Sequence, residues 1–428
     1  MPRGGICAKR GTALLPTPPT AFTSPGVVVL FQSSRAGLNA GLTRHLVDFI
    51  AGTEATLDVA IYDLRHPEIL SALAGLTKRQ VRLRVAYDGG SERTGGLGSD
   101  PKSSGTREAL AAAGLLPYAT AVHEQGRHLM HDKFLVRDGK SVWVGSANFT
   151  VGGLELQDNN CLILNSSALA ARYTTTLEDL LQPHHRHVQQ ADEPSTIDIG
   201  GVPFRAYFEP AEGEGIEQAI VSALKGARRV RIAAFLMSDP GILGALLPFS
   251  QDLHADIQGV YDPNGMQDVL RYSHQDKSLF WFVHDPRFVA APSHGFAPGR
   301  EQDFMHNKVM VIDDHLVFTG SYNYSENAEE NDETVLAVDG GAIASAYTGY
   351  ISTLIAAYKS PAKVASGAEP GEGGRHRSST LSSEIAVRKA SVSRTPQLDR
   401  AIRTVTWLLV AGLVILAIVI ILALHGNG

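Results

Sequence analysis

The sequence predicts an α/β protein with two pseudo-two-fold related halves, each a mixed β-sheet flanked by helices, followed by one C-terminal transmembrane helix. Three observations support this fold class. A polar motif occurs twice at a nearly constant offset, helix and strand patterns alternate within each half, and a long apolar run ends the chain. With 428 residues, of which 44% are hydrophobic, the chain is long enough for two sizeable cores.

The repeat is clearest in two strings, MHDKFLVRDGKSVWVGSANFT and MHNKVMVIDDHLVFTGSYNYS, which begin at Met130 and Met305. Each polar motif residue of the first string recurs 175 positions later. Strands outside the motif agree as well, because VAIYDL at 59–64 matches IAAFLM at 232–237. An offset that stays nearly constant over most of each half indicates duplication of a whole unit.

Each half has the same order of elements. A helical pattern at 42–52 or 216–227 leads into a short apolar strand, a second helix and another strand. This order predicts a partly parallel sheet with helices on both faces. The motif strands KFLVRD and KVMVID then run through short turns into SVWVGS and LVFTGS, which predicts a hairpin and makes the sheet mixed.

The remaining segments set the boundaries. Composition predicts a disordered leader at 1–26, a first half at 27–182, a linker at 183–200 and a second half at 201–359. The linker contains three histidines, but no carboxylate or cysteine stands at ligand spacing, so a polar linker is favoured over a metal site. Cys7 and Cys161 lie far apart and do not indicate a disulfide framework, which fits a reducing compartment.

The C-terminal end predicts a membrane anchor. Residues 404–424 contain no charged side chain, and as a helix they would span roughly 31 Å, close to the thickness of the bilayer core. Basic residues precede this run and only HGNG follows it, so the positive-inside rule places the large N-terminal part in the cytoplasm. The segment 360–403, rich in Ser, Gly and basic residues, is expected to be a flexible tether. No run in the leader is long enough for a signal-peptide core.

The motifs carry groups that suit a phosphate ester. Residues i and i+2 of a strand point to the same face, so His131 projects with Lys133, and His306 with Lys308. The residues that close the second strand of each hairpin are Gly145, Ser146 and Asn148 in the first copy, and Gly320, Ser321 and Asn323 in the second. They bring hydroxyl, carboxamide and backbone N–H groups near each His–Lys pair. Such a site can bind a tetrahedral anion with no evident need for a metal or other cofactor.

The motif aspartates have a different expected role. Asp138 and Asp313 stand five residues beyond each lysine and fall at the strand end, so they are expected to hold the turns as structural carboxylates. They are not expected to take part in catalysis.

The duplicated pattern His-x-Lys-x4-Asp-x6-Gly-Ser-x-Asn resembles the signature of the phospholipase D superfamily, and the resemblance covers about residues 27–358. It implies that both motifs meet at one site between the halves. It also implies that one histidine attacks phosphorus to form a phosphohistidine, while the other protonates the leaving alcohol and then activates water or an acceptor alcohol. The reaction would run without a metal, and the lysines and asparagines would stabilise the transition-state oxygens.

The two copies differ downstream of the Gly-Ser-x-Asn string. By resemblance, a carboxylate there holds a histidine ring, and the second copy supplies Glu333. Alignment through the flanking sequence places Asn159 opposite Glu333, whereas ungapped counting selects Asp158. An asparagine can orient an imidazole but cannot stabilise its cationic form, so the histidines are expected to differ. Resemblance to duplicated family members assigns attack to His131 and acid/base work to His306.

The phosphate-binding set predicted beside these groups joins the hairpin ends with the downstream asparagine. It consists of Gly145, Ser146, Asn159, Gly320 and Ser321.

The substrate is left open between two phosphodiesters. The anchor at 404–424 favours membrane phospholipid, because tethering confines the enzyme to a surface of head groups. The string HNKVMVID with FTGSYNYSENAEENDE resembles an endonuclease branch, so DNA or RNA is the alternative substrate. A net charge of −6 and the lack of a Lys/Arg-rich run in the halves disfavour nucleic acid. A non-catalytic membrane scaffold is a third reading, disfavoured because both His–Lys pairs are intact. The aromatic run at 280–282 is expected to be a core strand and not a lipid-docking face.

Overall fold

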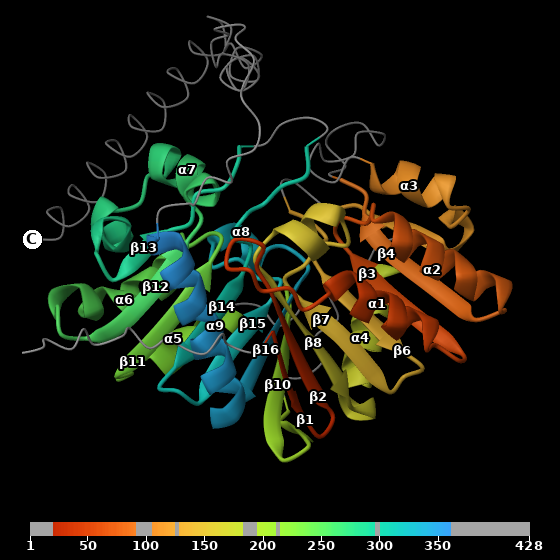
Figure 1. Cartoon of the computed structure of the whole chain (residues 1–428), viewed down its shortest axis with the longest axis horizontal. Coiled ribbons are helices and arrows are strands. Elements are labelled where there is room, and N and C mark those ends of the chain that lie inside the picture. The colour runs from red at the N-terminus through yellow and green to blue at the C-terminus, as the bar shows by residue number, and fades with distance from the viewer. Residues whose placement is uncertain are drawn as a thin grey trace, which may run out of the picture. The chain divides into compact units, whose positions relative to one another are not determined.

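The computed structural model describes residues 20–90, 105–124, 128–182, 195–210, 215–295 and 300–360 (Figure 1). The predicted membrane-spanning segment at 404–424 and the tether from residue 361 onward lie outside the described residues. Within those ranges, none of the helices is both long enough and apolar enough to cross a bilayer.

The first half forms one eight-stranded sheet with its helices. Its elements are β1 (Ala21–Ser24), β2 (Val27–Gln32), α1 (Leu42–Ala51), β3 (Thr56–Ile61), α2 (Pro67–Lys78), β4 (Arg82–Asp88), α3 (Thr106–Ala112), η2 (Leu116–Tyr118), β5 (Ala119–Val122), β6 (Lys133–Arg137), β7 (Ser141–Gly145), the π-helical turn η3 (Gly152–Leu156), β8 (Asn159–Asn165) and α4 (Ser167–Leu180). The strand order is β5-β4-β3-β6-β7-β8-β2-β1.

The second half repeats this plan. Its elements are β9 (Ile197–Ile199), β10 (Val202–Glu209), α5 (Gly215–Leu224), β11 (Arg229–Ala234), α6 (Pro240–Gln251), β12 (Asp256–Tyr261), α7 (Pro263–Tyr272), η4 (Lys277–His284), β13 (Phe288–Ala290), β14 (Lys308–Ile312), β15 (Leu316–Gly320), α8 (Glu326–Glu329), β16 (Glu333–Asp339) and α9 (Gly341–Lys359). The strand order, β13-β12-β11-β14-β15-β16-β10-β9, matches that of the first half strand for strand.

Both sheets are mixed for the reason that the sequence indicates. The strand–helix–strand units make β3, β4 and β5 parallel, and likewise β11, β12 and β13. The motif hairpins β6–β7 and β14–β15 are antiparallel. The prediction of two similar halves with mixed sheets is therefore confirmed.

A shared core joins the halves. On β6, Phe134 and Val136 point into a cluster that also contains residues of α4, α9 and the second sheet, while Leu135 points to a cluster under α1 and α2. On β14, Val309 joins the shared cluster and Met310 packs under α5 and α6. Figure 1 shows α1 and α2 on the outer side of the first sheet, with α5 and α6 on the outer side of the second. The motif strands are buried on both faces, which explains their continuous apolar sequence.

Three local predictions were wrong. Ala21–Ser24, placed in the disordered leader, forms β1 and pairs with β2 across a turn at Gly26, whose φ is 75°. Ile197–Ile199, placed in the linker, forms the equivalent edge strand β9 beside β10. The aromatic run that includes Phe280 and Phe282 is the 3-10 helix η4 and not a strand, although both rings are buried in the core as expected. Each missed strand is short and lies at a sheet edge, where the pattern gives little signal.

Candidate active site

Each motif histidine lies two residues ahead of a central strand. His131 precedes β6 and His306 precedes β14. In both cases the backbone is tied to the other half, because His131 N–H donates to the Asp332 carbonyl at 2.9 Å and His306 N–H donates to the Asp158 carbonyl at 3.0 Å. The halves are therefore joined at the motifs themselves. Both motifs thus lie where the halves meet, and the charge of His131 is one of the causes that lower the pKa of His306.

The imidazole rings are also held across the halves. Nδ1 of His131 lies 2.8 and 2.9 Å from the two carboxylate oxygens of Glu333, the first residue of β16. Nδ1 of His306 lies 3.3 Å from Oδ1 of Asn159, the first residue of β8. These contacts make Asn159, and not Asp158, the structural equivalent of Glu333. With Nδ1 engaged in this way, Nε2 is the ring nitrogen that each histidine can present to a substrate.

Burial controls the protonation of this group. His306 is 7% exposed and Glu333 is fully buried. Burial lowers the pKa of His306 well below its usual value, and the charges of Lys308 and Lys133 lower it further. Burial raises the pKa of Glu333 to about 7, although Lys133 acts in the opposite direction. His306 is therefore neutral near pH 7 until an anion binds beside it.

The motif lysines are buried in the same region. Nζ of Lys133 donates to the His131 carbonyl at 2.5 Å, and Nζ of Lys308 donates to the His306 carbonyl at 2.9 Å. Both side chains are 1% exposed. Burial lowers the pKa of Lys133 to about 8, and burial together with the charge of Lys133 lowers the pKa of Lys308 well below its usual range. Two cations this close favour an anionic ligand, whose charge would raise both pKa values again.

Two aromatic residues outside the predicted site also support the histidines. The ring of Tyr62 lies 5.0 Å from that of His131, and the ring of Phe235 lies 5.1 Å from that of His306. The motif lysines lie over the same two rings, at 5.1 and 5.4 Å from the centroids. The signal that would have found them is their shared place near the ends of the repeated strings VAIYDL and IAAFLM.

Asn159 is held by the fold as well as by His306. Its Oδ1 accepts from the Ser146 hydroxyl at 2.7 Å, and its Nδ2 donates to the Gly153 carbonyl at 2.8 Å and to Gln157 Oε1 at 3.2 Å. Both amide hydrogens are thus used within the protein. This placement favours a positioning role for Asn159 over the phosphate contact that the sequence predicts.

Ser321 has the matching role in the second half. Its Oγ accepts from the Thr334 N–H at 3.0 Å, and its hydroxyl makes a side-chain hydrogen bond to Glu333 that lowers the pKa of that carboxyl against the effect of burial. Ser146 and Ser321 therefore fix the positions of Asn159 and Glu333, which in turn hold His306 and His131.

The motif asparagines have a different environment. Asn148 and Asn323 are half-buried, and the Oδ1 atom of each is buried without a hydrogen-bond partner among the described residues. Each follows directly on the hairpin end, two residues after the motif serine. Their carboxamides are the motif groups that the local fold uses least, and this favours contact with a ligand.

The motif glycines are required by close backbone packing. A Cβ on Gly145 would collide with the Asn160 carbonyl, and a Cβ on Gly320 would collide with the Thr334 carbonyl. These carbonyls belong to strands paired in the sheet, so they cannot move away at low cost. The glycines bring β7 against β8 and β15 against β16 at the ends that carry the motif serines.

We expect Gly320→Ala to reduce the free energy of unfolding by about 2–4 kcal/mol, because the added methyl group would force two paired strands apart. Chemical denaturation of the variant and the wild type measures this loss. Gly349→Ala is the control: its Cβ would meet nothing within 4 Å in helix α9, and its stability should equal or exceed that of the wild type. Equal stability of both variants would contradict the packing argument.

The motif aspartates stand in the hairpin turns, and their carboxylates bind the backbone of other segments and not the histidines. Asp138 accepts the backbone N–H groups of residues 54–56 at 2.8–3.1 Å, and Asp313 accepts those of residues 228 and 229 at 2.8 Å. Burial alone would raise the pKa of Asp138, but these N–H groups lower it. Both residues anchor the segment that enters the neighbouring strand, β3 or β11.

A second set of polar contacts involves the residue that stands between histidine and lysine in each His-x-Lys string. Thr334 Oγ1 donates to Asp132 Oδ1 at 2.5 Å, and Asn160 Nδ2 donates to Asn307 Oδ1 at 3.1 Å. Each contact joins the middle residue of one His-x-Lys string to the opposite half. All four residues are buried. The sequence alone gives no sign that they pair.

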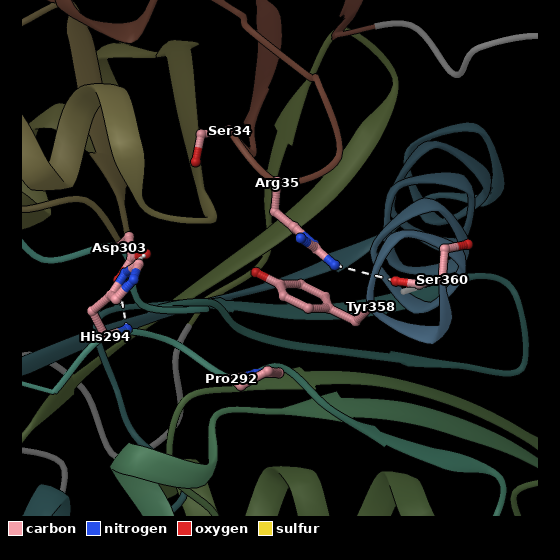
Figure 2. Close-up of a pocket in the computed structure, with 7 residues that line it drawn as sticks. All are labelled: Ser34, Arg35, Pro292, His294, Asp303, Tyr358 and Ser360. Atoms are coloured by element: carbon pink, nitrogen blue, oxygen red, sulfur yellow. Dashed lines mark hydrogen bonds and ion pairs between the residues drawn. The ribbon is translucent and has the colours of Figure 1, made fainter. Parts of the chain in front are cut away.

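A pocket of about 490 Å³ adjoins the approach to β14. It is lined by Ser34, Arg35, Pro292, His294, Asp303, Tyr358 and Ser360 (Figure 2). His294 Nδ1 lies 2.7 Å from Asp303 Oδ2, while Arg35 donates to the Ser360 carbonyl at 3.2 Å. Asp303 stands three residues before His306, so the pocket borders the segment that carries this histidine. The pocket lining includes one guanidinium, of Arg35, and one imidazole, of His294.

Comparison with known proteins shows the family of this chain. The family described as "Cardiolipin synthase, PLD-like domain" matches residues 46–181 and again 218–355. The chain belongs to this phospholipase D-like family. Each match contains one His–Lys motif and the residue, Asn159 or Glu333, that holds the histidine of the other half, so the duplication covers both halves of the site.

Individual relatives match a smaller part of the phospholipase D-like chain than the family does. Mitochondrial cardiolipin hydrolase of Xenopus laevis is 28% identical over 146 residues, which are 34% of this chain and 63% of that protein. The protein of the same name from Chlamydomonas reinhardtii is 25% identical over 139 residues, 32% of this chain and 56% of that one. The chain thus spans less than two-thirds of the length of these relatives.

A solved structure has the same fold. The crystal structure of phosphatidylserine synthase from Haemophilus influenzae matches with a TM-score of 0.56 and 14% identity, covering 79% of this chain and 88% of that one. This likeness extends across both halves of the phospholipase D-like fold.

The phospholipase D-like site combines three chemical functions. Two buried ammonium groups and two carboxamides can bind and stabilise a phosphate group. Two imidazoles, each fixed through Nδ1, can serve as nucleophile and as general acid. Their different partners, a carboxylate for His131 and a carboxamide for His306, make the two rings chemically unequal.

Proposed function

We propose that the chain is a phospholipase D-type phosphodiester hydrolase that acts on membrane phospholipid head groups through a phosphohistidine. The observation that carries the proposal is the crosswise support of the two histidines, His131 by Glu333 and His306 by Asn159. The general-acid histidine loses its proton and its positive charge in the first step, whereas attack on phosphorus makes the ring of the nucleophilic histidine cationic. A carboxylate on that ring, and a neutral group on the other, match this requirement.

In the first step, Nε2 of His131 forms a bond to phosphorus and the bond to the leaving alcohol breaks. His306, protonated once the anionic ester is bound, gives its Nε2 proton to the leaving oxygen. Glu333 accepts the Nδ1–H of His131 and stabilises the ring as it takes up positive charge. The ammonium groups of Lys133 and Lys308 stabilise the non-bridging oxygens.

In the second step, His306, now neutral, takes a proton from water. The resulting hydroxide attacks phosphorus, and the bond to His131 breaks. With water as acceptor and phospholipid as substrate, the products are phosphatidic acid and the head-group alcohol. An alcohol in place of water would give transphosphatidylation by the same steps. No step in this scheme uses a metal or another cofactor.

Three observations support a phospholipid substrate. The relatives that match are named mitochondrial cardiolipin hydrolase, and the fold is shared with a phosphatidylserine synthase. The run at 404–424 would anchor the chain in the bilayer, with the catalytic part on the cytoplasmic side. An enzyme held at that surface meets head groups at high local concentration.

A membrane-tethered nuclease that cleaves DNA or RNA is the second candidate. The form of the second motif, HNKVMVID followed by FTGSYNYS, favours it, because this string resembles the endonuclease branch of the superfamily. The same attack by His131 would cleave a nucleic-acid diester. The net charge of −6 argues against it, since phosphate-backbone binding depends on basic residues.

The test compares the two substrates directly. The full chain, purified in detergent with EDTA present, is incubated with vesicles of cardiolipin, phosphatidylglycerol or phosphatidylcholine, and separately with single-stranded DNA and RNA. We expect release of head group from lipid and intact nucleic acid. Cleavage of nucleic acid alone would replace the lipid proposal, and inactivity on every substrate would favour a scaffold. His131→Ala is run in parallel to exclude a contaminating enzyme.

A further inference from the structure

The two halves differ at a cluster outside the active site. In the first half, Thr43 lies in the first turn of α1, His66 is the N-cap of α2, and Glu155 lies in η3. His66 Nδ1 accepts from the Glu68 N–H at 3.2 Å, so the ring hydrogen is on Nε2, which lies 3.1 Å from Glu155 Oε1. The Thr43 hydroxyl donates to the same oxygen at 3.2 Å. A hydroxyl, an imidazole and a carboxylate thus satisfy one another.

The second half has three carboxylates at the equivalent places. Glu217 lies in the first turn of α5, Asp239 is the N-cap of α6, and Glu329 ends α8. The residues just before two of them, Ile216 and Ala328, are buried like their counterparts in the first half. One carboxylate oxygen from each of the three residues lies within 4.8 Å of the others. Where the first half has the His66 imidazole with its N–H group, the second half has the Asp239 carboxylate.

One buried oxygen of this cluster has no partner within the described ranges. Asp239 is fully buried; its Oδ1 accepts from the Ile242 N–H at 2.8 Å, and its Oδ2 has no hydrogen-bond partner among the described residues. The Tyr322 hydroxyl is also buried without one in the described part of the chain. Burial raises the pKa of Tyr322, and the charges of Asp239 and Glu329 raise it further. A buried carboxylate oxygen without a partner is costly unless a positive ligand joins it.

The backbone makes room for the acids. A Cβ on Gly241, in the first turn of α6, would collide with the carboxylate of Glu217. The glycine therefore allows this carboxylate to lie against the start of α6, next to Asp239. Glu217 and Glu329 are only half-buried, so the cluster is open to solvent on one side.

We propose that Glu217, Asp239 and Glu329 bind a hard divalent cation, Ca²⁺ or Mg²⁺, at the place where the first half has the His66 imidazole. All three ligands are carboxylate oxygens, which these ions prefer, and the open side leaves room for water to complete the coordination. The ion would tie α5, α6 and α8 together. Because α8 follows Ser321 and Asn323 directly, the ion would stabilise the segment behind the second motif without taking part in the reaction.

Thermal unfolding of the full chain in detergent tests the proposal. The protein is stripped with EDTA and then titrated with CaCl2 or MgCl2. We expect the Tm to rise by about 5 °C at a cation concentration about 100 times the Kd. Asp239→Asn keeps the N-cap of α6 but removes a charge, and it should lose this response. Asp276→Asn, which removes an exposed N-cap charge from η4, is the matched control and should respond like the wild type.

A second variant separates ion binding from folding defects. Asp239→His restores the arrangement of the first half, so it should raise the Tm in EDTA and abolish the response to cation. If Asp239→Asn fails to fold, Glu217→Gln and Glu329→Gln replace it, and terbium binding in the wild type, displaced by Ca²⁺, provides an independent measure. The proposal is wrong if Ca²⁺, Mg²⁺ and terbium all fail to bind the wild type, or if the charge-removing variants respond as the wild type does. Neither outcome depends on finding the substrate.

Discussion

His131→Ala and His306→Ala are each expected to lower kcat on a phospholipid substrate by about 10⁴-fold or more, because the remaining groups can bind the phosphate but cannot complete proton transfer and covalent attack. Initial rates of head-group release measure the loss. His254→Ala, an exposed histidine in the same half as His306, is the control and should keep full activity.

An activated substrate distinguishes the two histidines. A nitrophenyl phosphodiester has a leaving group that departs without a proton, so His306→Ala should still form the phosphohistidine and release one equivalent of nitrophenol in a burst. His131→Ala should form no phosphoenzyme on either substrate. Phosphoenzyme trapped only in His131→Ala would reverse the assignment, with His306 as the nucleophile.

The second large effect concerns the residues that hold the rings. Glu333→Gln is expected to lower kcat by about 10²–10⁴-fold, since the amide keeps the shape of the carboxylate but cannot stabilise a cationic His131 ring. Asn159→Asp should act on pH dependence instead. His306 has a lowered pKa, and as the general acid it must be protonated, so kcat/KM of the wild type should fall as pH rises through that low value. A carboxylate on its Nδ1 raises this pKa and should move the falling limb up by about 1 pH unit.

Profiles of kcat/KM against pH check this expectation. Asn165→Asp adds the same charge at the other end of β8 and should leave the profile in place. Measured Tm values show whether the buried position 159 tolerates a carboxylate. A profile that is identical for Asn159→Asp and the wild type would exclude His306 as the acid that limits the reaction, or Asn159 as the residue that sets its pKa.

Most of the fold could be predicted because it is repeated. The same order of patterns in both halves identifies the motif hairpins and the helices before them, and the structure has these elements with matching strand order. The edge strands β1 and β9 could not be predicted in the same way. They contain four and three residues, and β1 lies next to a Pro- and Thr-rich leader whose composition dominated the interpretation.

The site could be predicted in its components but not in its connections. Motif spacing identified the histidines and lysines, and resemblance to the family identified Glu333. The flanking alignment selected Asn159 as the counterpart of Glu333, with Asp158 as the alternative. Which ring each of these residues contacts depends on how the halves pack. His131 and Glu333 are separated by 202 positions, and no local pattern carries that pairing. The aromatic rings of Tyr62 and Phe235 were missed because each looks like an ordinary strand residue.

The crosswise support of the histidines has an evolutionary consequence. If two identical chains formed this site as a symmetric pair, both histidines would have the same supporting residue, and any substitution there would alter both. With the two copies on one chain, a change at position 333 acts on His131 alone and a change at position 159 acts on His306 alone. Duplication within a single chain thus allows selection to specialise one histidine without altering the other.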